Sequence, residues 1–263
     1  WGMRVFGRAA TNHLIGPALQ GIYAAAPTEL SAAVIVAGRA KGAGRTHRRI
    51  MAAPERGMGQ FVERLHDRLA AAGVRFAFDR RLDRLDPRTP TIVATDAAAA
   101  AALIDDTAPR VAAVLRRVRL LPLTTMTAFY PASPRDLHGF GVLFPRDAGI
   151  DALGVLFNAD VFAHRSAMRS ETWIHDAALT PDAATQKLAE DRRRLTGRDD
   201  APIDVVVTSR PHAVPLYGAA IAEVPAVLGE LPVRVQLAGN YLGRIGVAAL
   251  LEQAATAAGK LEV

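Results

Sequence analysis

The chain has 263 residues, half of them apolar, which is enough to bury one large core or two smaller ones. Cysteine is absent, so disulfide bridges, thiol chemistry and thiolate metal sites are excluded. The formal net charge is +6, but the arginines are scattered without interleaved aromatic residues, so we expect solvated faces and no nucleic-acid partner.

The chain begins with helical patterns. Residues 6–31 show helical apolar spacing, which is interrupted at Gly16 and Pro17 and ends near Pro27. Residues 32–51 become rich in glycine and arginine, which predicts a surface loop. A second helix is predicted from apolar residues that fall on one face, with Gly73 as its stop: Met58, Phe61, Val62, Leu65 and Leu69.

The next segment alternates strand and helix patterns. Val74, Phe76 and Phe78 occupy alternate positions and predict a short strand over 74–78. Residues 91–95 form a continuous β-rich run, typical of a strand covered on both faces. Asp96 is placed to cap a helix through the alanine run 97–102. Residues 58–106 therefore have a Rossmann-like rhythm.

The pattern changes at about residue 120. Four successive strands separated by Pro, Gly and Asp turns predict an antiparallel sheet: Leu123–Tyr130, Gly141–Phe144, Leu153–Phe157 and Glu171–His175. Pro181 is suited to the first position of a long charged helix that reaches Leu195 and stops at Gly197. A further strand is predicted over 204–208 and a short helix over 219–230.

The last part of the sequence predicts a strand at 233–237, a glycine-rich turn, and a helix from about Gly246 to Ala258. Gly239, Gly243 and Gly246 carry no Cβ, so such a turn lets the backbone approach a ligand closely. The following helix presents unpaired N–H groups and the positive end of its dipole, which favours an anion or an electron-rich ring. An ordinary strand-to-helix turn with structural glycines is the alternative.

This turn, AGNYLGRIGV at 238–247, resembles the C-terminal flavin-binding segment of the protoporphyrinogen oxidase and flavin amine oxidase family. Other stretches resemble family segments in the same order along the chain: FGRAATNHLIGPALQGIYAAAPTELS at 6–31, PERGMGQFVERL at 54–65, GFGVLFPRDAGIDALGVLFNADVFAHR at 139–165 and AVPLYG at 213–218. Each stretch is weak by itself, but together they cover nearly the whole chain.

The resemblance implies an α+β fold in which part of a Rossmann-like FAD domain is interleaved with a substrate domain of antiparallel sheet and helices. The implied ranges are 1–51 and 109–202 for the substrate domain, and 52–108 and 203–263 for the FAD domain. The implied activity is FAD-dependent oxidation of an apolar ring, as in the protoporphyrinogen oxidation of haem synthesis. An amine oxidase, an isoprenoid desaturase, or a non-enzymatic remnant that does not hold FAD is the alternative.

The resemblance also places the cofactor contacts. The backbone of Ile245, Gly246 and Val247 would meet the pyrimidine edge of the flavin, and Gly239 and Asn240 would lie near its ribityl-phosphate side. Leu82, in a strand after the short helix, would touch the adenine. No catalytic side chain is implied, because the flavin performs the chemistry, and the seven histidines have no metal-ligand spacing.

For the substrate, the resemblance implies that Leu143, Leu156 and Trp173 line one shared apolar cavity, while Arg146 pairs with a substrate carboxylate. A sheet core and a solvated loop arginine are the alternatives. No charge-free apolar run of about 18 residues predicts a membrane span. We expect a cytoplasmic protein with possible peripheral contact at the inner membrane face, and the sequence indicates no oligomeric state.

Three departures from the family pattern lower the expected activity. No GxGxxG turn for the FAD pyrophosphate occurs, so the sequence reads as the C-terminal part of a longer protein that by itself binds FAD weakly or not at all. Arg244 stands where the family commonly has a small residue, so it either turns to solvent or alters the flavin approach. Arg210 stands where many members place tryptophan.

Overall fold

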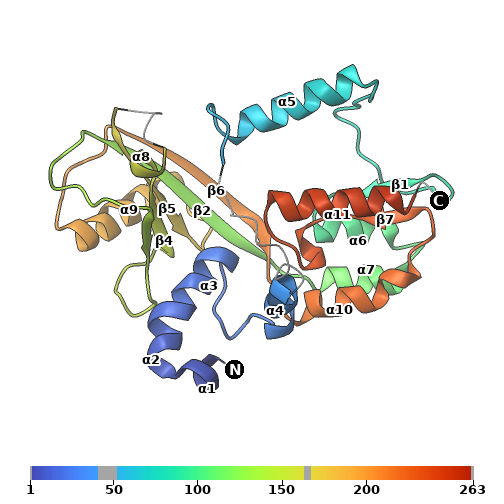
Figure 1. The fold of residues 1–263 in the computed structure, drawn as a ribbon, viewed down its shortest axis with the longest axis horizontal. Helices are drawn as coiled ribbons and strands as arrows, with labels where there is room; N and C mark the ends of the chain where they lie inside the picture. The colour runs from blue at the N-terminus through green and yellow to red at the C-terminus, as the bar shows by residue number, and fades with distance from the viewer. Residues whose placement is uncertain (1, 41–51, 163–166, 262–263) are drawn as a thin grey trace.

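The computed structural model describes residues 2–40, 52–162 and 167–261 (Figure 1). Two groups of elements form the fold. An antiparallel sheet with helices on its faces lies at one side, and a cluster of helices around a short parallel sheet lies at the other. The α+β class predicted from the sequence is confirmed.

The larger sheet has five strands in the order β3 (Gly141–Leu143), β4 (Gly154–Phe157), β5 (Arg169–His175), β2 (Leu120–Tyr130) and β6 (Asp204–Pro215). All pairs are antiparallel, as the strand pattern predicted. β6 pairs with β2 along almost its whole length, so the sheet extends beyond the domain boundary predicted at residue 203. The domain ranges themselves stay a prediction.

The two faces of this sheet differ in burial. One face packs on α9 (Pro181–Thr196), and its buried cluster includes Met126, Val155, Trp173 and Leu188. Pro181 begins this helix and Gly197, at φ 71°, ends it, as predicted. We call the opposite side the open face, and it carries half-buried or exposed side chains that include Leu143, Leu156, Thr172, Thr127 and Val206.

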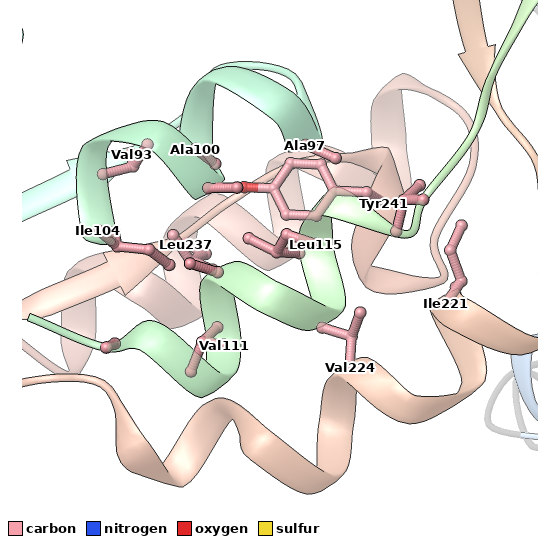
Figure 2. Close-up of a cluster of buried hydrophobic side chains, with 14 of the residues drawn as sticks. Val93, Ala97, Ala100, Ile104, Val111, Leu115, Ile221, Val224, Leu237 and Tyr241 are labelled. Carbon is pink, nitrogen blue, oxygen red and sulfur yellow. The ribbon is translucent and has the colours of Figure 1, made fainter. Parts of the chain in front are cut away.

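The smaller sheet joins β1 (Thr91–Val93) and β7 (Val235–Leu237) in parallel. Three helices pack around it: α6 (Ala97–Ile104), α7 (Pro109–Arg116) and α10 (Ala219–Val227). Figure 2 shows the apolar residues that these elements share, with Tyr241 lying across Ala97 and Ala100. Asp96 caps α6 as predicted, because its Oδ1 accepts from the N–H groups of Ala98 and Ala99, each at 2.9 Å.

The N-terminal segment is more helical than the sequence predicted. It contains α1 (Gly2–Phe6), α2 (Arg8–Ala10), a π-helical turn (Thr11–Ile15), α3 (Gly16–Tyr23) and α4 (Ala32–Ala40). Pro17 is accommodated in the first turn of α3, and the helix ends at Ala24, which adopts φ 53°. The loop predicted for 32–51 is wrong over 32–40, where the alanines and valines form α4; residues 41–51 lie outside the described part.

The segment around α5 (Met58–Ala71) stands apart from the rest of the fold (Figure 1). The helix is amphipathic as predicted, yet it has no buried residue. The strand predicted at 74–78 is wrong, because no described strand lies beside this segment to complete a ladder. Phe76 and Phe78 instead stack on each other, with ring centroids 6.0 Å apart.

The remaining elements are short or lie at the C-terminus. α8 (Asn158–Val161) follows β4 directly, and the 3₁₀ turns η2 (Leu228–Glu230) and η3 (Asn240–Leu242) flank β7. The last helix, α11 (Val247–Gly259), follows the glycine-rich turn as the sequence predicted.

Candidate functional site

The glycine-rich turn leads from β7 into α11 and is fixed at its start by hydrogen bonds. The N–H of Ala238 donates to the carbonyl of Val93, and the N–H of Gly239 donates to Oε1 of Gln253 on α11 at 2.7 Å. The 3₁₀ turn η3 follows, and Gly243 leaves it with φ 84°. The turn is therefore a defined backbone structure supported by both β1 and α11.

The end of this turn is open to solvent. Gly246 adopts φ 91°, which favours glycine, and a Cβ added there would meet no described atom within 4 Å. Its neighbours Ile245 and Val247 are 41% and 49% exposed. No side chain caps the first turn of α11, so its N–H groups remain available to a ligand at the positive end of the helix dipole.

Gly239 has a different reason for being glycine. A Cβ there would come within 2.4 Å of Cε1 of the Tyr241 ring, so the position is filled by that ring. Tyr241 is buried and packs in the cluster shown in Figure 2. Asn240 begins η3 and is half-buried beside it. The contacts predicted from Gly239 and Asn240 to the cofactor stay a prediction.

The side chain of Arg244 forms an ion pair with α11. Its Nη2 donates to Oε2 of Glu252 at 2.6 Å, so the side chain runs along α11. Its carbonyl accepts from the Tyr217 hydroxyl at 3.0 Å. Of the two expectations for this arginine, the structure favours the one in which the guanidinium is directed away from Gly246.

Leu82 lies in coil and is 64% exposed, so the strand expected to carry it is absent from the described structure. Its predicted contact with adenine stays a prediction.

The register of the larger sheet tests the predicted apolar cavity. Leu156 pairs with Gly141, and Leu143 pairs with Gly154, so both leucines project from the open face. Trp173 pairs with Val155 and Met126, which belong to the buried face. The expected cavity shared by all three residues is therefore wrong for Trp173, because side chains alternate between faces along a strand.

Trp173 is part of the core instead. It is fully buried and stacks on Phe144, with ring centroids 5.9 Å apart. Its Nε1 donates to Oε2 of Glu171 at 3.2 Å. The residue of β5 that pairs with Leu156 on the open face is Thr172.

Arg146 follows β3 and donates to Asp176, which compensates its charge within the chain. The open face carries another arginine, Arg210, which pairs in register with Leu123. Arg210 has no ion-pair partner within the described ranges, so the structure places an unneutralised cation there rather than at Arg146.

The structure also shows two polar clusters that the sequence did not indicate. On the buried face, Arg192 is 2% exposed, donates to Glu171, and lies 3.6 Å from the centroid of the Tyr130 ring. The arginine run 192–194 was interpreted as a solvated face, which is wrong for Arg192. Burial opposes ionisation of Asp200, but hydrogen bonds from Arg192 and Arg198 outweigh it and lower its pKa to about 2.

On the open face, Thr127, Thr172 and Asn158 form a hydrogen-bonded polar row. Thr127 and Thr172 share a hydrogen bond of 2.8 Å, and Asn158 Nδ2 lies 2.6 Å from the Thr172 hydroxyl. The alternating threonines of β2 were a signal for this row, but they were interpreted only as strand formers.

A cavity of about 320 Å³ lies at the end of the larger sheet remote from the glycine-rich turn. His138, Asp160 and Arg169 contribute to its wall; Asp160 accepts from Arg169 at 2.9 Å and lies 3.2 Å from His138 Nδ1. No group of three metal-binding side chains occurs in the described ranges. None of the described helices is long and apolar enough to cross a membrane.

The α+β fold described above is shared with several solved enzyme structures. Among solved structures, a protein from Exiguobacterium sp. 255-15 that is provisionally assigned as a protoporphyrinogen oxidase matches 99% of this chain at 18% identity, with a TM-score of 0.73. Reduced UDP-galactopyranose mutase matches 91% of the chain at 10% identity, with a TM-score of 0.68. Cyclohexylamine oxidase from Brevibacterium oxydans IH-35A matches 79% at 17% identity, with a TM-score of 0.58.

The chain spans 66%, 61% and 53% of the lengths of these three proteins, respectively. No family model matches the sequence, and no curated protein matches it. The likeness therefore establishes the fold, in agreement with the resemblance found in the sequence.

Proposed function

We propose that this chain forms the substrate-binding part and one cofactor-binding edge of an FAD-dependent oxidoreductase of the protoporphyrinogen oxidase type. When bound, FAD would supply a hydride acceptor at N5, with oxygen or a quinone as the final electron acceptor. The observation that carries the proposal is the exposed backbone at Ile245, Gly246 and Val247, which fits a flavin edge: it is open, lacks a capping side chain and begins a helix.

The residues of the turn would favour the reduced cofactor. Negative charge develops at the pyrimidine edge of a flavin on reduction, and the positive end of the α11 dipole would stabilise that charge. Val247 begins the helix, where N–H groups have no intrahelical acceptor, and no described side chain caps this end. Arg244 is bound to Glu252 and leaves this approach clear.

The open face would bind the substrate. Leu143 and Leu156 supply apolar surface, and Gly21 of α3 packs closely on Leu143, because a Cβ at Gly21 would come within 2.6 Å of Leu143 Cδ2. A flat apolar ring suits such a face. Arg146 stays a weaker proposal for substrate contact because Asp176 already pairs with it.

The test is a titration of FAD into the purified chain, followed by flavin fluorescence and by absorbance near about 450 nm. We expect weak binding, with a Kd above about 1 µM, because no GxGxxG turn is present to hold the pyrophosphate. Gly246→Val should abolish this binding, since a β-branched residue is strained at φ 91° and fills the open approach.

Gly197→Val is the matched control. Gly197 has φ 71° and no described atom within 4 Å of an added Cβ, so the substitution introduces comparable strain at the far end of α9. The proposed role of the turn fails if the two variants lose FAD equally, and submicromolar binding by wild type would contradict the expected weak affinity. Absence of FAD binding by wild type would favour the non-enzymatic alternative.

An amine oxidase or isoprenoid desaturase remains the alternative within the same fold. Oxidation of a primary amine rather than of a ring substrate by the flavin-loaded protein would favour it. Peripheral membrane association stays a prediction.

A further inference from the structure

The polar row Thr127–Thr172–Asn158 crosses the open face beside apolar side chains. The register places Leu156, Thr172, Thr127 and Val206 on one rung that runs across four neighbouring strands. Neighbours on a rung lie about 5 Å apart, so the leucine, the two hydroxyls and the valine form one continuous surface. Val206 is 53% exposed, and the row itself is half-buried.

A count of protons shows that the row has a hydrogen-bond donor to spare. The two threonine hydroxyls carry one proton each, but only one proton occupies the bond between them. If Asn158 donates to Thr172, the second hydroxyl proton has no acceptor in the row. If the amide is reversed and accepts from Thr172, both amide protons point elsewhere. Either arrangement leaves a free donor.

Among the described residues, the side-chain hydrogen bonds of the row are all internal. Within the described ranges, neither threonine hydroxyl has a further hydrogen bond, and no carboxylate lies in hydrogen-bond contact with the row. A half-buried donor on an otherwise apolar surface gains most from a ligand acceptor, because water is partly displaced when an apolar ring covers the face.

We infer that the polar row Thr127–Thr172–Asn158 is a specificity element that binds a carbonyl or carboxylate oxygen at the edge of a flat apolar ring. This inference rests on the proposed function, which makes the open face the substrate side, and it deepens that function by naming the polar group required of the ligand.

The experiment measures porphyrin binding to the chain without flavin, by the change in porphyrin absorbance. Three planar probes differ only at the edge: protoporphyrin IX has carboxylates, its dimethyl ester has neutral carbonyls, and etioporphyrin has neither.

Thr172→Val keeps the shape of the side chain and removes the hydroxyl. Thr125→Val is the matched control, because Thr125 lies on the open face of the same strand pair and has no side-chain hydrogen bond in the described structure.

We expect Thr172→Val to weaken protoporphyrin IX binding by about five- to tenfold, the effect of losing one hydrogen bond. Etioporphyrin should bind wild type and the variant alike, and Thr125→Val should bind all probes as wild type does. A loss for the ester as large as for the acid identifies a neutral acceptor, and a loss for the acid alone identifies a carboxylate; both support the inference.

The inference is overturned if Thr172→Val weakens all three probes equally, if Thr125→Val has the same effect, or if wild type binds none of them. Circular dichroism of each variant confirms that the fold is retained. Because flavin is absent, these results are independent of the Gly246→Val titration, so a failure here is distinguishable from a failure of the proposed function.

Discussion

The change in the free energy of unfolding on replacement of Trp173 by alanine distinguishes a side chain in the core from one that lines an open pocket. The ring is fully buried between Phe144 and the α9 side of the sheet. Burial of a tryptophan removes up to about 250 Å² of surface from water, and alanine at the same position still buries a part of this area. At about 25 cal/mol per Å², the remaining difference corresponds to a loss of close to 4 kcal/mol in the free energy of unfolding. This agrees with about 3–5 kcal/mol for large-to-small changes in a packed core.

The assay is urea unfolding followed by far-UV circular dichroism, because the substitution removes a tryptophan that fluorescence would report. Trp173→Phe keeps a stacked ring but loses the donor to Glu171, and should cost about 1–2 kcal/mol. Leu143→Ala is the surface comparison, since Leu143 is 47% exposed, and should cost about 1 kcal/mol or less. A loss below about 1.5 kcal/mol for Trp173→Ala, or one equal to that of Leu143→Ala, would refute the assignment of Trp173 to the core.

Three further predictions concern buried polar groups and a helix cap. Burial lowers the pKa of His175 below 6.5, although Asp191 lies 3.5 Å away. The contribution of the neutral imidazole to the free energy of unfolding is therefore fully present above pH 6.5 and is lost as the pH falls from 6.5 through the lowered pKa. His175→Gln should remove this part of the pH dependence of urea unfolding. The Tyr241 hydroxyl is buried without a partner in the described structure, so Tyr241→Phe should leave stability unchanged or raise it by up to about 1 kcal/mol, and a loss above about 1 kcal/mol in thermal unfolding would contradict this. Asp96→Ala should cost about 1 kcal/mol in the same measurement, because two N–H groups of α6 lose their acceptor.

The strands of the larger sheet were predictable because each has a local pattern, but the face on which a given residue lies was not. Thr172 and Trp173 are neighbours in sequence, and only the register with Leu156 shows that Thr172 faces the open side. A shift of one residue exchanges the two faces completely. The pattern therefore located the strand, but Trp173, which was expected to share a face with Leu156, lies on the opposite face.

Segments whose pattern depends on a partner were predicted less well. The alternation at 74–78 fits a strand, but a strand forms only when a neighbour completes its hydrogen bonds, and the described residues provide none. The burial of a charged side chain depends on partners in the same way, as Arg192 shows. Arg193 and Arg194 are exposed, whereas Arg192 is buried because Glu171 and Asp200 compensate its charge and its guanidinium lies over the Tyr130 ring.

The glycines of the turn look equivalent in the sequence, yet the structure gives them different physical roles. At Gly239 an added Cβ would collide with the ring of Tyr241, so glycine there serves the packing of the helical cluster. At Gly246 an added Cβ would meet no described atom, and the φ of 91° is what favours glycine there. The proposed approach of a flavin therefore concerns the segment 245–247, whereas glycine at position 239 is explained by the packing of the Tyr241 ring.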